Sequence, residues 1–128
     1  MAQASEGRSW PTELRLAKDR RSLTISFEDG TSFVLPAEYL RVESPSAEVQ
    51  GHNPDERITV AGKREIGIME VNPIGNYAVR LVFDDMHSTG IYSWDYFHQL
   101  GREHDARWAR YLDELEMKKL SRDPVGRK

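Results

Sequence analysis

The stretch SLTISFEDGTSFVLP, from Ser22 to Pro36, predicts two antiparallel strands joined by a tight turn. Leu23, Ile25 and Phe27 alternate with polar residues, which is the period-two pattern of a half-buried strand. The turn is EDG, where Gly30 can take the positive φ that such a turn requires. Because the alternation resumes after the glycine, this hairpin indicates that the fold is built on a β-sheet.

The segment in front of the hairpin, TELRLAKDR, alternates in the same way, with Leu14 and Leu16 on one face. It predicts a third strand, and three consecutive strands joined by short turns form an antiparallel meander. Small and polar residues dominate before it, so we expect a disordered lead over residues 1–10. A single ordered domain is then expected over 11–120, followed by a disordered tail over 121–128.

Short patterns continue in the second half of the chain. PAEYLRV predicts a short helix, because Pro36 suits the first helical turn, where its missing N–H costs nothing. A long polar loop runs to about Glu56, and the strand candidates after it are RITVAG, IGIMEVNP, NYAVRLVFDD and the short GIYSW. In IGIMEVNP, strict alternation would place Ile68 and Glu70 on one face and Val71 on the other.

The pattern then changes to a helical period. Ser93 is a plausible N-cap for WDYFHQLGRE, and Gly101 can end that helix. DARWARYLDELEMKKL predicts a second helix, with Trp108, Leu112 and Leu115 on its apolar face. The sequence therefore predicts an α+β fold: an antiparallel sheet meander, a short helix after the third strand, and two C-terminal helices packed on the sheet.

The composition is that of one domain with a wet surface, since 38% of the 128 residues are hydrophobic and 30% are charged. A net charge of −3 gives no general attraction to nucleic acid or anionic lipid, so neither nucleic acid nor membrane is an expected partner. The absence of cysteine excludes disulfides, thiolate zinc sites and cysteine nucleophiles. No window approaches the roughly 20 apolar residues of a spanning helix, and no secretory signal is present, so we expect a cytoplasmic protein.

Motifs of known chemistry are missing. The chain has no phosphate-binding loop, no dinucleotide fingerprint and no nucleophile elbow, and no serine, histidine and acid stand in a recognisable catalytic order. His98 and His104 flank the junction of the two predicted helices, and we interpret them as surface or cap residues. We therefore expect no catalytic residues and no enzyme, with a small hydrolase or isomerase using His87 and a carboxylate as a remote alternative.

His87 leaves two interpretations open. It lies in the turn DMHSTG, where it is either a polar residue bonded to a carboxylate or a metal ligand. In the second case His52 of the long loop, together with Asp85 and Glu48, would complete a ligand set. Imidazole and carboxylate ligands suit zinc or iron.

Several motifs, taken in order, resemble one known family. LPAEYLR, SPSAEVQGH, GNYAV and HSTGIYSWDY follow one another as in the gamma-butyrobetaine hydroxylase-like N-terminal domain, a small domain of uncharacterised function common in bacteria. The resemblance runs from Pro11 to Leu120. It implies a compact α+β fold with an antiparallel sheet, in agreement with the periodicity.

The resemblance also limits the function. In oxygenases the small domain precedes a catalytic double-stranded β-helix domain, and it is also found fused to P-loop ATPases of the iron–sulfur carrier type. A chain of 128 residues is too short to hold that catalytic domain as well. The resemblance therefore implies a stand-alone accessory domain without oxygenase activity.

In the oxygenases the small domain binds a structural zinc through three cysteines and one histidine. By resemblance, the cysteine positions correspond to Ser44, Ser46 and about Val49, and the histidine corresponds to His87. Hydroxyls are poor zinc ligands beside thiolates, and valine is none, so we expect the family's zinc site to be lost. The resemblance also implies that the loop after the short helix meets the turn around His87.

We therefore expect an accessory or interaction domain whose partner is an unidentified protein, with a role linked to iron or iron–sulfur metabolism. Its expected interaction loop is made of Ser44, Ser46, Glu48 and His52, beside the turn that holds His87. The alternative is a domain that binds zinc or iron through His87, His52 and Asp85. Oligomeric state is left open.

Overall fold

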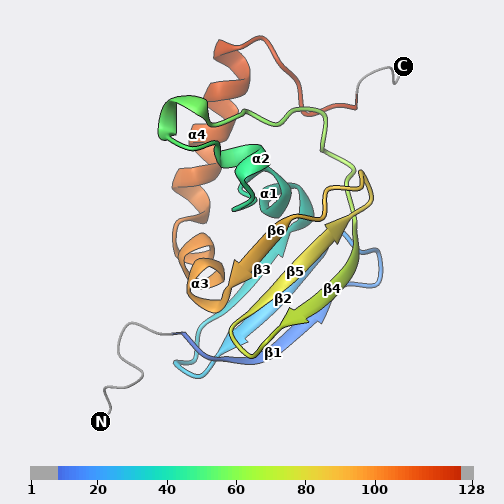
Figure 1. The fold of residues 1–128 in the computed structure, drawn as a ribbon, viewed down its shortest axis with the longest axis vertical. Helices are drawn as coiled ribbons and strands as arrows, with labels where there is room; N and C mark the ends of the chain where they lie inside the picture. Colours follow the sequence, from blue (N-terminus) through green and yellow to red (C-terminus); the bar gives the residue numbers. More distant parts are fainter. Residues whose placement is uncertain (1–8, 125–128) are drawn as a thin grey trace.

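The computed structural model describes residues 9–124, and its β-structure consists of two three-stranded antiparallel sheets (Figure 1). The strands of sheet A are β1 (Pro11–Leu16), β2 (Ser22–Phe27) and β3 (Ser32–Pro36). The strands of sheet B are β4 (Ile68–Ile74), β5 (Ala78–Phe83) and β6 (Gly90–Ser93). Each sheet is a meander of consecutive strands, and the predicted hairpin is confirmed, with Ile25 opposite Phe33.

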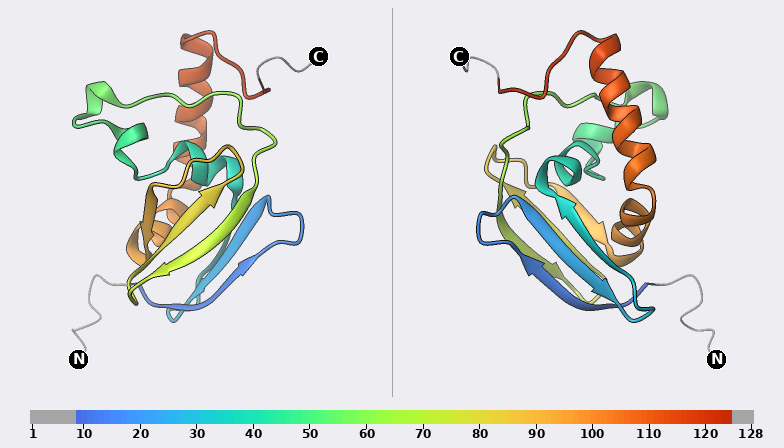
Figure 2. Two further views of the ribbon diagram at one scale, coloured as in Figure 1. Left: turned by 45° about the vertical axis from the view of Figure 1, so that its right-hand side comes forward. Right: turned by 180° about the vertical axis from the view of Figure 1, so that it is seen from behind.

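The described part of the chain also contains four α-helices and one short 3₁₀ turn. They are α1 (Ala37–Val42), α2 (Ala47–Gln50), the 3₁₀ turn Pro54–Glu56, α3 (Trp94–Arg102) and α4 (His104–Met117). The predicted α+β class is confirmed, with its short helix after the third strand and two C-terminal helices. Figure 2 shows the helices gathered at one side of the sheets, with α4 running past α1 and α2. None of the described helices is both long enough and apolar enough to cross a membrane.

The larger of two hydrophobic clusters lies between the two sheets and the helices, and the smaller one joins Val42 to Tyr111 and Leu115 of α4. Leu23 of β2 and Leu81 and Phe83 of β5 are fully buried in the larger cluster. Tyr39 of α1 is also fully buried, and its hydroxyl donates to the carbonyl oxygen of Leu100 in α3 at 2.7 Å. A buried phenol needs such a partner, so this bond helps to fix α1 relative to α3.

Strand β4 carries a bulge that alternation did not predict. Its pairing with β5 shifts between Ile68 and Glu70, so Met69 is an extra residue on this strand. The expectation that Glu70 shares the face of Ile68 is therefore wrong, because the extra residue reverses the alternation. Glu70 is exposed, and Val71 packs against the core.

The segment RITVAG is not a strand, contrary to the prediction, and forms an irregular connection. The N–H of Ile58 donates to the carbonyl oxygen of Val49 at 2.7 Å, and the carbonyl oxygen of Val60 accepts from the Tyr111 hydroxyl at 2.6 Å. Its partners are thus a loop helix and α4 rather than another strand. A segment with a β-type sequence pattern does not form a strand where no neighbouring strand is available to pair with it.

Two details of the C-terminal helices differ from the prediction. Gly101 lies inside α3 rather than at its end, and a Cβ there would be 2.3 Å from Cγ of Phe33. The glycine is therefore required by close packing on β3. In α4 the buried residues are Tyr111 and Leu115, while Leu112 is 40% exposed.

The last residues of the expected disordered lead make defined contacts. The N–H of Glu28 donates to the carbonyl oxygen of Trp10 at 2.9 Å, which extends the pairing beyond β1. The N–H of Ser9 donates to Oδ1 of Asp95 at 2.6 Å. The rest of the lead, residues 1–8, lies outside the described residues.

The first residues of the expected disordered tail are also bonded. Arg122 forms two hydrogen bonds with the carboxylate of Glu38, at 2.8 and 2.7 Å, and its guanidinium lies 5.1 Å from the ring centre of Trp108. These contacts tie the chain after α4 to α1. Residues 125–128 lie outside the described residues.

Candidate functional site

The loop after α1 and the turn between β5 and β6 meet in space, as the resemblance implied. Oγ of Ser44 lies 2.9 Å from Nε2 of His87, and Oγ of Ser46 lies 2.6 Å from Oγ1 of Thr89. The other ring nitrogen of His87, Nδ1, lies 3.0 Å from Oε1 of Glu48. These side chains form what we call the His87 cluster: Ser44, Ser46, Glu48, His87 and Thr89.

The two serines shape the loop as well as linking it to the turn. Oγ of Ser44 accepts from the N–H of Ser46 at 3.2 Å, and Oγ of Ser46 accepts from the N–H of Glu48 at 3.1 Å, which caps α2. Gly90 allows the close approach, because a Cβ there would lie 2.6 Å from Oγ of Ser44. The predicted long loop is therefore a compact segment that contains α2.

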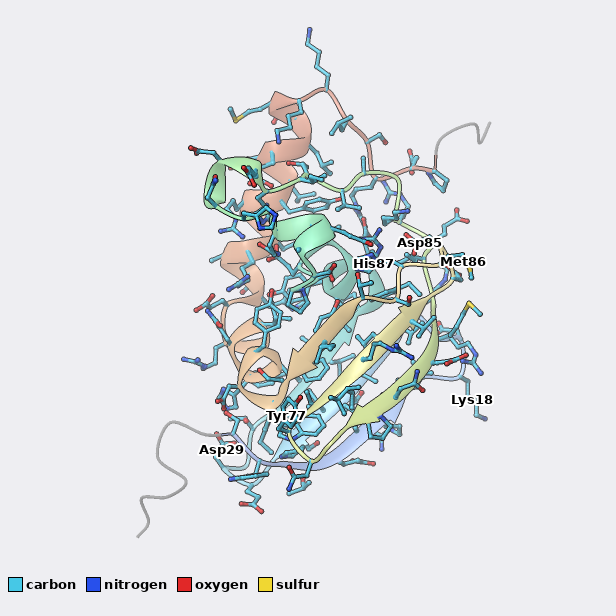
Figure 3. All side chains as sticks on the ribbon, in the orientation of Figure 1. Lys18, Asp29, Tyr77, Asp85, Met86 and His87 are labelled. Carbon is cyan, nitrogen blue, oxygen red and sulfur yellow. The ribbon has the colours of Figure 1, made fainter. Side chains whose placement is uncertain are left out.

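The turn that carries His87 is held by its own backbone and by two aspartates. The N–H of Met86 donates to the carbonyl oxygen of Phe83, and the N–H of Phe83 donates to that of His87. The N–H of His87 donates to Oδ1 of Asp85 at 3.0 Å, and Asp84 accepts from the N–H of Gly67 at 3.1 Å. Figure 3 places His87 toward the α1–α2 segment and Met86 at the outer edge of the turn.

Asp85 forms ion pairs with two cationic side chains. Its Oδ2 lies 2.9 Å from Nε of Arg41 and 2.7 Å from Nζ of Lys63. Burial alone would raise the pKa of Asp85, but the hydrogen bonds from Lys63 and the His87 amide and the Arg41 charge lower it to about 2. Nη1 of Arg41 is buried with no hydrogen-bond partner among the described residues.

His52 lies apart from this arrangement. It is exposed, and its backbone N–H donates to Oε1 of Glu56 at 2.9 Å. Of the three predicted metal ligands, the structure brings His87 and Asp85 together, through a hydrogen bond from the His87 amide and the charge of Asp85 near the His87 ring. His52 forms no hydrogen bond or ion pair with either of them in the described part of the chain. Within residues 9–124, no group of three or more histidine, aspartate or glutamate side chains converges to hold a metal ion.

The residues at the family's zinc positions do not fit a structural zinc. Ser44 and Ser46 offer hydroxyls, Val49 is a buried hydrocarbon, and both ring nitrogens of His87 already have partners. A structural zinc takes four nitrogen or sulfur ligands in a tetrahedron. Here hydrogen bonds connect the same two segments instead.

The His87 cluster has the connectivity of a nucleophile, a base and an acid, an order that was not visible in the sequence. Catalysis needs a hydroxyl that substrate can reach and an acid shielded from water, and here the opposite holds. Ser44 is fully buried, whereas the Glu48 side chain is 64% exposed. A substrate cannot reach the hydroxyl, and the acid is exposed to water, so the arrangement serves structure rather than acyl transfer.

The protonation of His87 follows from the same burial. Burial first, and then the charge of Arg41, lower the pKa of His87 below its ordinary value of 6.5, while Glu48 and Asp85 oppose this shift. At neutral pH the ring is therefore uncharged. One nitrogen then donates and the other accepts within the cluster.

A second buried polar cluster was missed by the sequence analysis. The side chain of Glu43 is 1% exposed, with Oε1 at 2.8 Å from Arg107 and Oε2 at 3.3 Å from Arg57. Arg110 lies 3.6 Å from the same carboxylate, and the Tyr96 hydroxyl donates to the Glu43 carbonyl oxygen. The available signal was the i, i+3 spacing of Arg107 and Arg110, which places both guanidinium groups on one face of α4.

Comparisons with known proteins support the resemblance. The sequence pattern of the family described as gamma-butyrobetaine hydroxylase-like, N-terminal, matches residues 14–98. None of the curated proteins matches the chain.

Solved structures agree with this assignment. One solution NMR structure is 44% identical, covers 94% of this chain and 97% of its own, and has a TM-score of 0.78. A second is 42% identical, covers 100% and 97%, and has a TM-score of 0.79. A crystal structure of a DUF971 family protein of unknown function from Acidithiobacillus ferrooxidans is 37% identical, covers 71% and 91%, and has a TM-score of 0.59.

Proposed function

The chain belongs to the gamma-butyrobetaine hydroxylase-like N-terminal family, and from this premise we propose that it is a non-enzymatic domain that binds another protein. The solved relative whose family is stated is itself described as having unknown function. The fusions known for the family favour a cytoplasmic bacterial partner that handles iron or iron–sulfur clusters. Support for an interaction role comes from one exposed residue, Met86.

Met86 is 74% exposed and has a φ of +74°. A non-glycine residue in this left-handed region costs about 1–2 kcal/mol, so glycine would suit the backbone better. Most of the apolar surface of the side chain stays exposed in the folded chain. Neither backbone preference nor packing accounts for methionine here, whereas contact with another molecule would.

The neighbouring residues give this end of the molecule a recognisable chemistry. Met69, the extra residue of the β4 bulge, is 43% exposed, and its carbonyl oxygen accepts from Arg20 at 2.8 Å. Arg21 donates to the carbonyl oxygen of Glu65 at 3.4 Å, and Lys18 lies along the same edge as Met86 in Figure 3. Bonds to carbonyl oxygens position the two guanidinium groups without cancelling their charge.

We call this surface the methionine face: Met69, Met86, Lys18, Arg20 and Arg21. Of the three non-glycine residues with positive φ among residues 9–124, Arg20 and Met86 both lie here. Exposed methionines adapt to an apolar groove, and the basic rim attracts carboxylates. The proposed partner therefore presents an apolar groove bordered by acidic side chains.

The expected interaction loop divides into two parts. Ser44 and Ser46 are 0% and 6% exposed, so they hold the loop in place. Glu48 and His52 are exposed and are the members that a partner can reach. Contact of a partner with the loop is therefore tested separately from contact with the methionine face.

The test is photo-crosslinking of the full chain in cells of its source. A photoreactive residue is placed at Met86, at His52, or at the matched control Met117, which is 82% exposed at the end of α4. We expect one protein to be crosslinked at Met86 and not at Met117. The purified partner should then bind the unmodified chain, and Met86→Gly should weaken binding at least about tenfold.

Met86→Gly is a clean variant because glycine suits the observed φ, so loss of binding cannot be ascribed to unfolding. Equal crosslinking at Met86 and Met117, or an unchanged Kd for Met86→Gly, would contradict the proposal. Crosslinking at His52 alone would move the surface to the loop.

The metal-binding alternative through His87, His52 and Asp85 has its own measurement. Thermal unfolding is followed with and without Zn(II) or Fe(II), since an ion bound only to the native state raises Tm by mass action. A rise that His87→Ala abolishes would support the alternative. We expect no rise, because Asp85 is already paired with Arg41 and Lys63.

A further inference from the structure

A pocket of about 240 Å³ lies at the end of β5 opposite the methionine face. Tyr77 precedes β5 and Met86 follows it, and Figure 3 labels them at the two ends of sheet B. The lining residues are Ser9, Trp10, Tyr77, Ser93, Trp94 and Asp95. Three are aromatic and one is a carboxylate, and none of the lining residues among 9–124 is basic.

The Trp94 ring is held in place by two contacts, and the Tyr77 ring lies beside a glycine. The indole N–H of Trp94 donates to the carbonyl oxygen of Asn76 at 2.9 Å, and its ring stacks on Phe97 with centres 6.3 Å apart. Tyr77 lies against Gly75, where a Cβ would be only 3.1 Å from the Tyr77 ring. Gly75 also has a φ of +55°, so the glycine serves both the turn and the ring.

The remaining aromatic residue and the carboxylate come from elements distant in sequence. The backbone of Trp10 is positioned by the bond between its carbonyl oxygen and the Glu28 N–H. Oδ1 of Asp95 accepts from the Ser9 N–H at 2.6 Å, and Oδ2 has no hydrogen-bond partner within residues 9–124. The pocket thus combines ring faces with a carboxylate oxygen that has free lone pairs.

We propose that this pocket binds an alkylammonium cation. Ring faces of tryptophan and tyrosine attract an ammonium group within about 6 Å, and a carboxylate beside them adds a full negative charge. A neutral apolar ligand would leave the negative charge of the Asp95 carboxylate uncompensated. Because the Trp94 ring is already fixed, less conformational entropy is lost when a ligand binds.

The pocket lies at the amino end of α3, but this position does not make it a site for an anion. The amino end of a helix carries roughly half a positive charge, which the full charge of Asp95 exceeds. The cap is also satisfied, since Oγ of Ser93 accepts from the Tyr96 N–H at 3.1 Å. An anion placed in this pocket would face Asp95 directly.

Two sources of the cation share this chemistry: a small free ammonium compound, or a lysine side chain of another protein, with or without methyl groups. The test titrates the ¹⁵N-labelled full chain with choline chloride and, separately, with N-acetyl-lysine methylamide and its trimethyl form. The neutral isostere 3,3-dimethylbutan-1-ol and sodium chloride serve as ligand controls. The three tryptophan indole N–H signals report the site.

We expect the signals of Trp10 and Trp94 to shift with the ammonium probes. The signal of Trp108 is an internal control, because Trp108 does not line the pocket and its ring already contacts the guanidinium of Arg122. The Kd for the best ammonium probe should be at least about tenfold lower than for the isostere. The stronger of choline and the lysine compounds identifies the source of the cation.

Three variants separate the interactions. Tyr77→Phe keeps the ring and should bind as the parent does, whereas Tyr77→Leu should weaken binding at least about fivefold. Asp95→Asn keeps an acceptor for the Ser9 N–H but removes the charge, and should also weaken binding severalfold. Tyr77 is 57% exposed, so neither Tyr77 variant threatens folding.

Equal affinity for choline and the neutral isostere would overturn the proposal, since the pocket would then be merely apolar. Absence of any shift up to about 100 mM of every ammonium probe would overturn it as well. Equal weakening by Tyr77→Phe and Tyr77→Leu would point to the hydroxyl and contradict the role of the ring.

Discussion

Glu43 and Ser44 are neighbours in sequence and are both buried, yet they belong to opposite kinds of polar cluster. Glu43 is a carboxylate surrounded by Arg57, Arg107 and Arg110, so its environment is ionic. Ser44 bonds to an uncharged His87 ring, so its environment is neutral. Glu43 caps the end of α1, and Ser44 begins the loop that follows it.

This difference indicates which of the two clusters contributes more to the free energy of unfolding. A buried ion that loses its partner leaves an uncompensated charge, whereas a buried neutral group that loses one loses a hydrogen bond. The Glu43 cluster joins α1, the irregular 57–62 connection and α4. The His87 cluster joins only the loop and the β5–β6 turn.

The largest effect is expected for Glu43→Ala. The change leaves the guanidinium groups of Arg57 and Arg107 half-paired, since Glu114 and Glu103 still contact them. We expect the free energy of unfolding to fall by about 3 kcal/mol, the low end of the range for breaking a buried pair. Urea unfolding monitored by tryptophan fluorescence measures it.

The matched control is Glu13→Ala, because Glu13 pairs with Arg15 where both side chains are at least half exposed. We expect a change below about 0.5 kcal/mol there. Similar losses for the two variants would remove the distinction between a buried ionic cluster and a surface pair.

The second effect concerns His87→Ala. It removes the bonds to Ser44 and Glu48 and leaves a small gap, so we expect a loss of about 2 kcal/mol at pH 7. The variant His98→Ala is a control, because His98 is also a bonded histidine but lies near the β2–β3 turn. A loss for His87→Ala no larger than for His98→Ala would contradict a structural role for the cluster.

The same variant defines a pH dependence. The pKa of His87 is lowered below 6.5 in the folded state, so the unfolded chain binds more protons just below that pH. The free energy of unfolding should therefore fall as the pH falls from about 7 to about 5, and His87→Ala should flatten this slope. Asp85 contributes to the pH dependence only at lower pH. Because its pKa in the folded state is about 2, its stabilising contribution is retained until the pH falls below the ordinary value of 3.8.

The third effect is expected for Ser46→Ala, which removes both the α2 cap and the contact with Thr89. We expect a loss of about 1 kcal/mol in urea unfolding. Thr89→Ala removes only the contact and should cost less, because Thr89 is exposed. Equal losses would show that capping contributes nothing here.

What the sequence predicted follows from how local each signal is. The Ser22–Pro36 hairpin depends on alternation and a glycine turn a few residues apart, so it was found. The contact of Ser44 with His87 spans 43 residues and was found only through the family resemblance. The Glu43–Arg107 pair spans 64 residues, and the spacing of the two arginines on α4 does not indicate which carboxylate they contact.

The bulge at Met69 and the aromatic pocket were missed for related reasons. One extra residue leaves alternation intact on each side of it, so the sequence alone does not show where the pattern reverses. Trp10, Tyr77 and Trp94 come from three separate segments of the chain. Pockets arise from tertiary arrangement, which residue periodicity does not encode.

The smallest effect is expected for Glu48→Gln. At pH 7 the ring of His87 is uncharged and the Glu48 side chain is 64% exposed, so the change should be below about 0.5 kcal/mol. The charge of Glu48 favours protonated His87, so its removal should lower the pKa of His87 further. Acid should then destabilise Glu48→Gln more than the parent, although the two are nearly equal at pH 7. Urea unfolding at about pH 7 and about pH 5 measures both differences, and parallel curves would mean that Glu48 does not act on His87.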